Sequence, residues 1–208
     1  MATALLNIIF WFAPQVIISI SNFRSADDQL ILINYKLILM GTVRTQSFLH
    51  ELNSEYKATL ACLKAIPQAL FEYKPHPKSM NMGYLSLLVA EIPLWIKHMV
   101  VDGEIDFVTF KHFSPTTNSE LVAHFEANVD AARNALSNTS DEELQESFSL
   151  KANGQLLYTA PKIIDVGTTL NHWVHHRGQL TVYMRLNDIP VPSIYGPSAD
   201  DKSFTGPK

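Results

Sequence analysis

The stretch Asn171-His172-Trp173-Val174-His175-His176-Arg177-Gly178-Gln179-Leu180 lies in a segment, 161–187, whose residues predict a long helix. His172 and His176 stand four residues apart, so both imidazoles leave one face of this helix about 6 Å apart. Two such imidazoles can bind one divalent ion. A catalytic zinc-type site normally has three protein ligands and one open position. The presence of a third ligand therefore decides what this helix can do.

Three further segments, 46–66, 83–101 and 119–137, carry apolar residues at helical spacing. Pro93 lies inside the second of them and predicts a kink or one missing backbone hydrogen bond. The alternating segment 145–159 around Asn153-Gly154 predicts a small β-hairpin. Four long amphipathic segments with modest connections predict an all-α protein, a four-helix bundle with a small hairpin before the last helix.

The amino-acid composition limits the functions that this protein can have. With 208 residues, 47% of them hydrophobic, the chain can bury one sizeable core. A net charge of -4 argues against a nucleic-acid partner, which would require a basic face. The single cysteine, Cys62, excludes an internal disulfide and fits a reducing compartment, so we expect a cytoplasmic protein with Cys62 in the core.

The first 39 residues differ from the rest of the chain. Ala4 to Ile20 is mostly apolar, but this stretch fits neither a secretory signal nor a membrane span. We interpret 1–39 as an extension upstream of the true start at Met40, 40–201 as the helical domain and 202–208 as a frayed tail. Two alternatives for 1–39 stay open: a membrane anchor or uncleaved signal, and an extra helix packed on the domain. A membrane partner is not expected for the domain itself.

Three separated stretches form a specific combination: Lys74-Pro75-His76-Pro77-Lys78-Ser79-Met80, Ala90-Glu91-Ile92-Pro93-Leu94-Trp95, and His172 to Leu180 followed by Val191-Pro192 and Tyr195 to Asp200. Together they resemble the DinB family of small helical-bundle proteins, over about residues 40–201. The resemblance implies an up-down-down-up four-helix bundle that is often a homodimer. It also implies a divalent metal, Zn or Ni, held by three histidines, and a metal-dependent thiol transferase or hydrolase activity on a small-molecule or thiol substrate.

The resemblance places two of the metal ligands at His172 and His176. The third family position lies three residues before Glu91, where this chain has Leu88. Leucine has no lone pair, and two imidazoles alone bind a metal more weakly than three. We therefore expect a degenerate metal site.

Three outcomes for the missing ligand stay open. In the first, Glu91, one turn beyond Leu88, supplies a carboxylate ligand. In the second, His50 or Glu51 on the first helix supplies the ligand. In the third, the metal site is empty. The alternative function is a non-catalytic small-molecule-binding or stress-response protein that has lost its metal, with the two histidines hydrogen-bonded inside the bundle.

The other notable side chains have simpler interpretations. We predict Trp95 and Trp173 to line the core or a pocket beside the histidines. Arg177 is expected to pair with Glu91 or Asp200. The remaining histidines considered, His76, His112 and His124, are expected to be solvated surface residues. No residue is singled out as catalytic.

Overall fold

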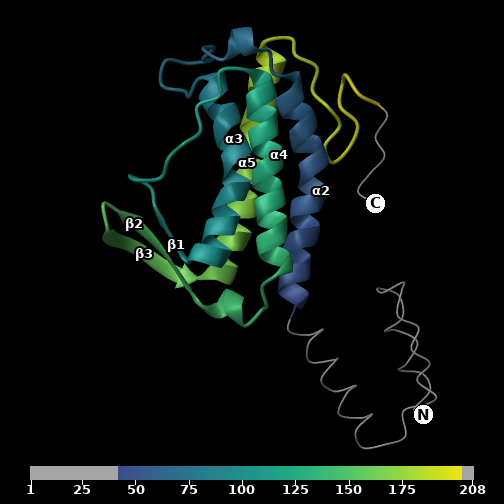
Figure 1. Ribbon diagram of the computed structural model, residues 1–208. Helices are drawn as coiled ribbons and strands as arrows, with labels where there is room; N and C mark the ends of the chain where they lie inside the picture. Colours follow the sequence, from purple (N-terminus) through teal and green to yellow (C-terminus); the bar gives the residue numbers. More distant parts are fainter. Residues whose placement is uncertain (1–41, 203–208) are drawn as a thin grey trace, which may run out of the picture. The chain divides into compact units, whose positions relative to one another are not determined.

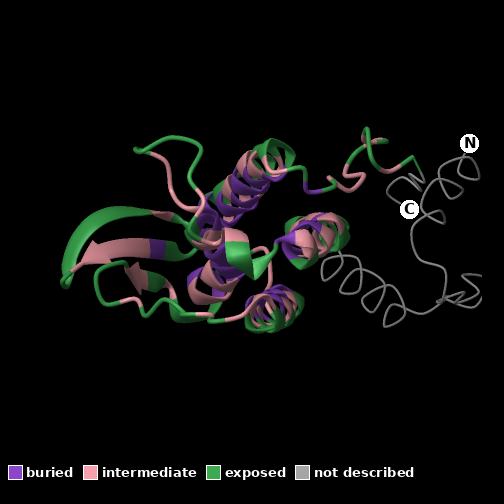
Figure 2. Ribbon diagram, turned by 90° about the horizontal axis from the view of Figure 1, so that it is seen from above, coloured by how far each residue is buried: buried purple, intermediate pink, exposed green. Residues whose placement is uncertain are grey.

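The computed structural model describes residues 42–202, and four long helices make up most of this part (Figure 1). Buried residues face the space between these helices (Figure 2). The prediction of a mainly helical fold is confirmed, with helix ends shifted by a few residues. The expectations for 1–39 and for the tail beyond 202 lie outside the described residues. The helices are α2 (Val43–Ala65), α3 (Met82–Lys97), α4 (Asn118–Ser137) and α5 (Lys162–Leu186).

Short helical turns connect or extend the long helices. The 3-10 turns η3 (Gln68–Leu70) and η5 (Glu143–Gln145) precede α3 and the β-hairpin, respectively. The third, η4 (His98–Asp102), is a π-helix that continues α3 and ends at Gly103, whose φ is +69°. The sequence predicts the helix through this region but gives no sign of the change in hydrogen-bonding pattern.

A small sheet lies beside one end of the helices (Figure 1). Strands β2 (Ser147–Ala152) and β3 (Gln155–Pro161) form the predicted hairpin, and their turn residues Asn153 and Gly154 have φ of +48° and +77°. Positive φ at both central residues is typical of a tight hairpin turn. A third strand, β1 (Glu104–Asp106), pairs parallel with β2 and was not predicted. Three residues are too few to show a strand period.

Pro93 lies in the middle of α3 without ending it. Proline has no N–H, so the carbonyl four residues earlier, that of Val89, loses its helical donor. The indole Nε1 of Trp173 on α5 donates to this oxygen at 2.9 Å. The side-chain amide of Asn128 on α4 donates to the neighbouring carbonyl of Ala90, also at 2.9 Å. Side chains of both α4 and α5 thus form hydrogen bonds to the backbone of α3 next to the helical hydrogen bond that Pro93 removes.

Residues Met82–Asp102 are long and apolar enough to cross a membrane by composition. However, 61% of the apolar window is buried inside the protein, where it contacts α4 and α5. A core helix passes the same composition test. The hydropathy of α3 is therefore explained by its central position among the described helices.

Candidate functional site

His172 and His176 converge as their spacing predicts. Their Nε2 atoms lie 2.7 Å apart, and Nδ1 of His176 lies 2.7 Å from Oε1 of Gln179. An amide oxygen only accepts, so Nδ1 of His176 carries a proton and its Nε2 is an acceptor. His172 therefore donates from its own Nε2. Gln179 fixes the orientation of His176, a role that the sequence did not indicate.

Both imidazoles are held in the neutral form. Burial lowers the pKa of His172, and the neighbouring His176 and His175 lower it further. Burial also lowers the pKa of His176, although the hydrogen bond to Gln179 partly opposes this. A neutral imidazole is the form that ligates metals. It is equally the form that shares one proton in a histidine–histidine hydrogen bond.

α3 presents an aromatic ring toward this pair. The ring of Trp95 lies 5.6 Å from that of His172, centroid to centroid. Leu88 lies seven residues before Trp95, close to two helical turns, and so shares its face of α3. Leu88 is half-buried and packs against the core. Across residues 42–202, no group of three His, Cys, Asp or Glu side chains could hold a metal ion.

Glu91, the first candidate substitute ligand, belongs to a different cluster. It is buried and accepts from His112 Nδ1 at 2.6 Å and from the backbone N–H of Phe113 at 2.7 Å. Nε2 of His124 lies 3.5 Å from the same carboxylate. The expectation of a surface position holds for His112, whose side chain is 43% exposed although it binds this carboxylate. It is wrong for His124, whose side chain is only 18% exposed. Spacing along the sequence cannot show that the segment before α4 folds over α3.

The two tryptophans have different positions. Trp95 is half-buried and borders the histidine pair. Trp173 is only 1% exposed and lies in the core, with its ring 6.0 Å from that of Phe125. Only Trp95 is positioned to form a wall beside the imidazoles.

Arg177 points away from the pair, toward α2. It is 2% exposed and forms an ion pair with Glu55 at 2.5 Å, while Tyr195 accepts from its Nη2 at 3.0 Å. The predicted pairing with Glu91 or Asp200 is wrong. Asp200 instead binds Arg185.

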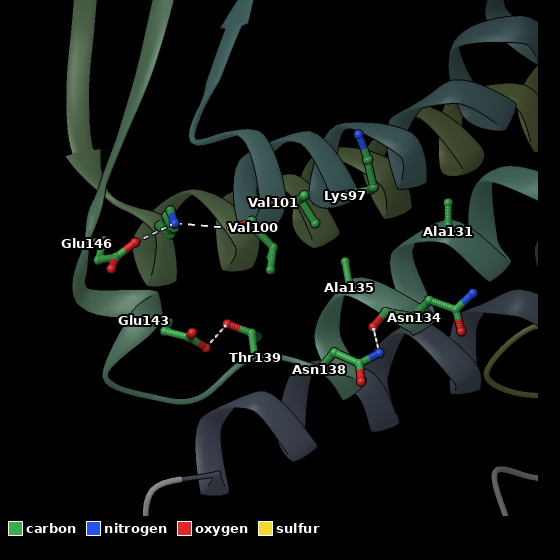
Figure 3. A pocket seen from close by; sticks show the side chains of 11 residues that line it. Lys97, Val100, Val101, Ala131, Asn134, Ala135, Asn138, Thr139, Glu143 and Glu146 are labelled. Carbon is green, nitrogen blue, oxygen red and sulfur yellow. Dashed lines mark hydrogen bonds and ion pairs between the residues drawn. The ribbon is translucent and has the colours of Figure 1, made fainter.

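A separate cavity of about 620 Å³ lies between α4 and the π-helical end of α3 (Figure 3). Neither histidine of the pair lines it. Its lining is mixed, with apolar residues, two lysines, two glutamates and side-chain amides. No motif in the sequence indicated this cavity, because its walls come from α3, η4, α4, η5 and α5.

The residues present match two of the three metal ligands that the resemblance implies. His176 has the tautomer typical of metal-binding histidines, with Nδ1–H bound to an oxygen, but its unprotonated Nε2 accepts from His172 and would have to exchange that hydrogen bond for a metal. The third position is filled by a side chain without a donor atom. The residues present therefore do not complete a three-ligand catalytic centre.

The comparisons with known proteins agree with this fold. A DinB-like protein from Bacillus cereus ATCC 10987 has 22% identity and a TM-score of 0.59, covering 72% of this chain and 97% of its own. A DinB-like protein from Bacillus subtilis has 18% identity and a TM-score of 0.57, covering 69% and 96%. No curated protein matches. The family model for the DinB family matches residues 40–205, so this chain belongs to the DinB family.

Proposed function

We propose that this protein is a DinB family member with an incomplete divalent-metal site. In this proposal His172 and His176 bind Zn or Ni weakly, and a ligand from solution, water or a thiolate, fills the remaining positions. The observation that carries the proposal is the 2.7 Å approach of Nε2 of His172 to Nε2 of His176, beside the ring of Trp95. A thiol transferase or hydrolase activity would depend on that outside ligand, because the chain itself supplies only two donors.

The alternative is a non-catalytic bundle protein that binds a small molecule or acts in a stress response without metal. The same hydrogen bond favours this alternative, because it pairs the two Nε2 atoms with no ion. The two proposals differ in how the protein responds to a chelator. Stability that falls on chelation supports the first, and unchanged stability supports the second.

We further propose the up-down-down-up connectivity, a homodimer and a cytoplasmic location. The lone buried cysteine is compatible with a reducing compartment. Contacts between helices support the connectivity: α2 and α5 run in the same direction, while α3 opposes α5 and α4 opposes α2. The contacting pairs are Phe48 with Gly167, Glu55 with Arg177, Lys162 with Val100, Tyr183 with Met80, Asn118 with Leu63, and Thr45 with Asp141.

The decisive experiment restores the missing ligand. Zn²⁺ and Ni²⁺ affinities are measured by calorimetric titration for the wild type, Leu88→His and His176→Ala. Leu88→His should raise the affinity at least about tenfold, and His176→Ala should abolish binding. Leu94→His is the matched control, because Leu94 is half-buried on the same helix but faces another direction. Equal affinities for Leu88→His, Leu94→His and wild type would refute the proposed site.

A further inference from the structure

The cavity of about 620 Å³ between α4 and η4 lies apart from the histidine pair and has no part in the proposed function. Its volume is in the range of small-molecule pockets. Val100 and Val101 of the π-helical turn line one side, and π-helical turns are frequent at functional sites. Figure 3 shows Glu143 and Glu146 at one end of the cavity, with Asn134 and Asn138 at the other.

Lys162 neutralises one of these carboxylates. Its side chain is 9% exposed, and its Nζ lies 2.8 Å from Oε2 of Glu146 and 3.2 Å from the carbonyl oxygen of Val100. Glu146 itself is 63% exposed. The other lysine of the lining, Lys97, is paired with Asp102 at 2.8 Å. Neither ammonium group is left without a carboxylate partner.

Glu143 carries a charge that is not neutralised by an ion pair. The backbone N–H of Ser140 and the hydroxyl of Thr139 donate to its Oε2, and these bonds, with a smaller effect of the nearby charge of Lys162, hold the pKa of Glu143 below its ordinary value. Glu143, Glu146 and Lys162 therefore sum to one negative charge. In the described structure, Oε1 of Glu143 and Oε1 of Glu146 make no hydrogen bond, so two charged acceptors remain at this end.

The rest of the cavity suits a ligand that has an apolar part and a polar end. Ala131, Ala135 and Val100 give it apolar walls, and Ala135 and Val100 are each 7% exposed. The side-chain amides of Asn134 and Asn138, each with an acceptor oxygen and an NH2 donor, lie across from the carboxylates. A bound anion would be repelled by the net negative charge of this end, whereas a cation would meet carboxylate oxygens that accept no other hydrogen bond.

We propose that this cavity binds a small organic cation of the primary amine class. Its ammonium group is held by Oε1 of Glu143 and Glu146, and its hydrocarbon part lies on Ala131 and Ala135. Lys162 acts as a positioning residue, because it fixes Glu146 at the edge of the cavity. The carboxylates are open to solvent, so binding of a minimal ligand is weak, in the millimolar range.

The test uses two probes of equal length and opposite charge, butylammonium and butyrate, followed by amide NMR shifts of the full-length protein. Butylammonium should shift the amides of residues around Ala131 and Glu143, and butyrate should not. Glu143→Gln and Glu146→Gln should each weaken butylammonium binding about threefold to fivefold. Glu142→Gln is the matched control, because Glu142 is exposed in the same segment and does not line the cavity.

Far-UV circular dichroism checks that each variant is folded, and Glu143→Gln is the decisive variant because it breaks no ion pair. Equal shifts with both probes, no shift with butylammonium, or full butylammonium binding in folded Glu143→Gln would overturn the proposal. Each of these results is independent of metal binding at His172 and His176, so failure here leaves the proposed function unaffected.

Discussion

Replacement of Trp173 by phenylalanine tests the hydrogen bond between α5 and the backbone of α3 near Pro93. The indole Nε1 lies 2.9 Å from the carbonyl oxygen of Val89, and Trp173 is 1% exposed. Pro93 cannot supply a helical donor to that oxygen. Trp173→Phe therefore leaves a buried carbonyl without a partner, which costs about 1–3 kcal/mol. The lost indole atoms add on the order of 1–2 kcal/mol.

A double-mutant cycle separates these two contributions. Pro93→Ala returns an N–H to position 93, where it can donate to Val89 along the helix. In that background, Trp173→Phe loses only ring volume. The expected coupling free energy between the two substitutions is therefore about 1–2 kcal/mol.

The control cycle pairs Pro93→Ala with Asn128→Ala. Asn128 donates to the carbonyl of Ala90, whose helical donor is the N–H of Leu94 and not a proline. This cycle should show coupling within about 0.5 kcal/mol of zero. Urea unfolding followed by circular dichroism gives the free energies, since tryptophan fluorescence would change with the substitution itself. Equal coupling free energies in the two cycles would refute the idea that Trp173 replaces the hydrogen-bond donor that Pro93 lacks.

Four further predictions concern buried side chains and the tyrosine that contacts one of them. Burial depresses the folded-state pKa of His172 and His176 below the ordinary 6.5, so their contribution to stability is complete above 6.5 and is lost as the pH falls through the depressed values. Between neutral pH and about pH 5, the unfolding free energy measured in urea should fall less for the His172→Gln/His176→Gln double variant than for the wild type. Burial raises the pKa of Cys62 to about 11, so its thiol should react with a disulfide reagent only after urea unfolding. Arg177→Met should destabilise the fold by about 3–5 kcal/mol in urea titrations, because it leaves a carboxylate of α2 buried without its ion pair. Tyr195→Phe should cost only about 1 kcal/mol, since that ion pair remains.

The sequence predicted the features that local spacing encodes. Helical periodicity gave four long helices, and Asn153-Gly154 gave the hairpin, because both signals depend on neighbouring residues. The four-residue spacing of His172 and His176 likewise ensured that the two rings would meet. Sequence spacing did not reveal which helix faces which. The partner of Arg177, the cluster around Glu91 and strand β1 all depend on contacts between residues far apart in the chain.

The same distinction applies to the site itself. Two histidines at helical spacing resemble a metal site, yet the same two rings also form a hydrogen bond to each other. Each ring satisfies the other, and Gln179 satisfies the remaining nitrogen of His176. Removal of either ring would leave a buried nitrogen without a partner. The histidines therefore cannot by themselves distinguish a metal site from a structural pair. A substitution at position 88 distinguishes the two. A histidine there would add nothing to the hydrogen bond between His172 and His176, but it would add a third ligand to a metal and so raise its affinity strongly.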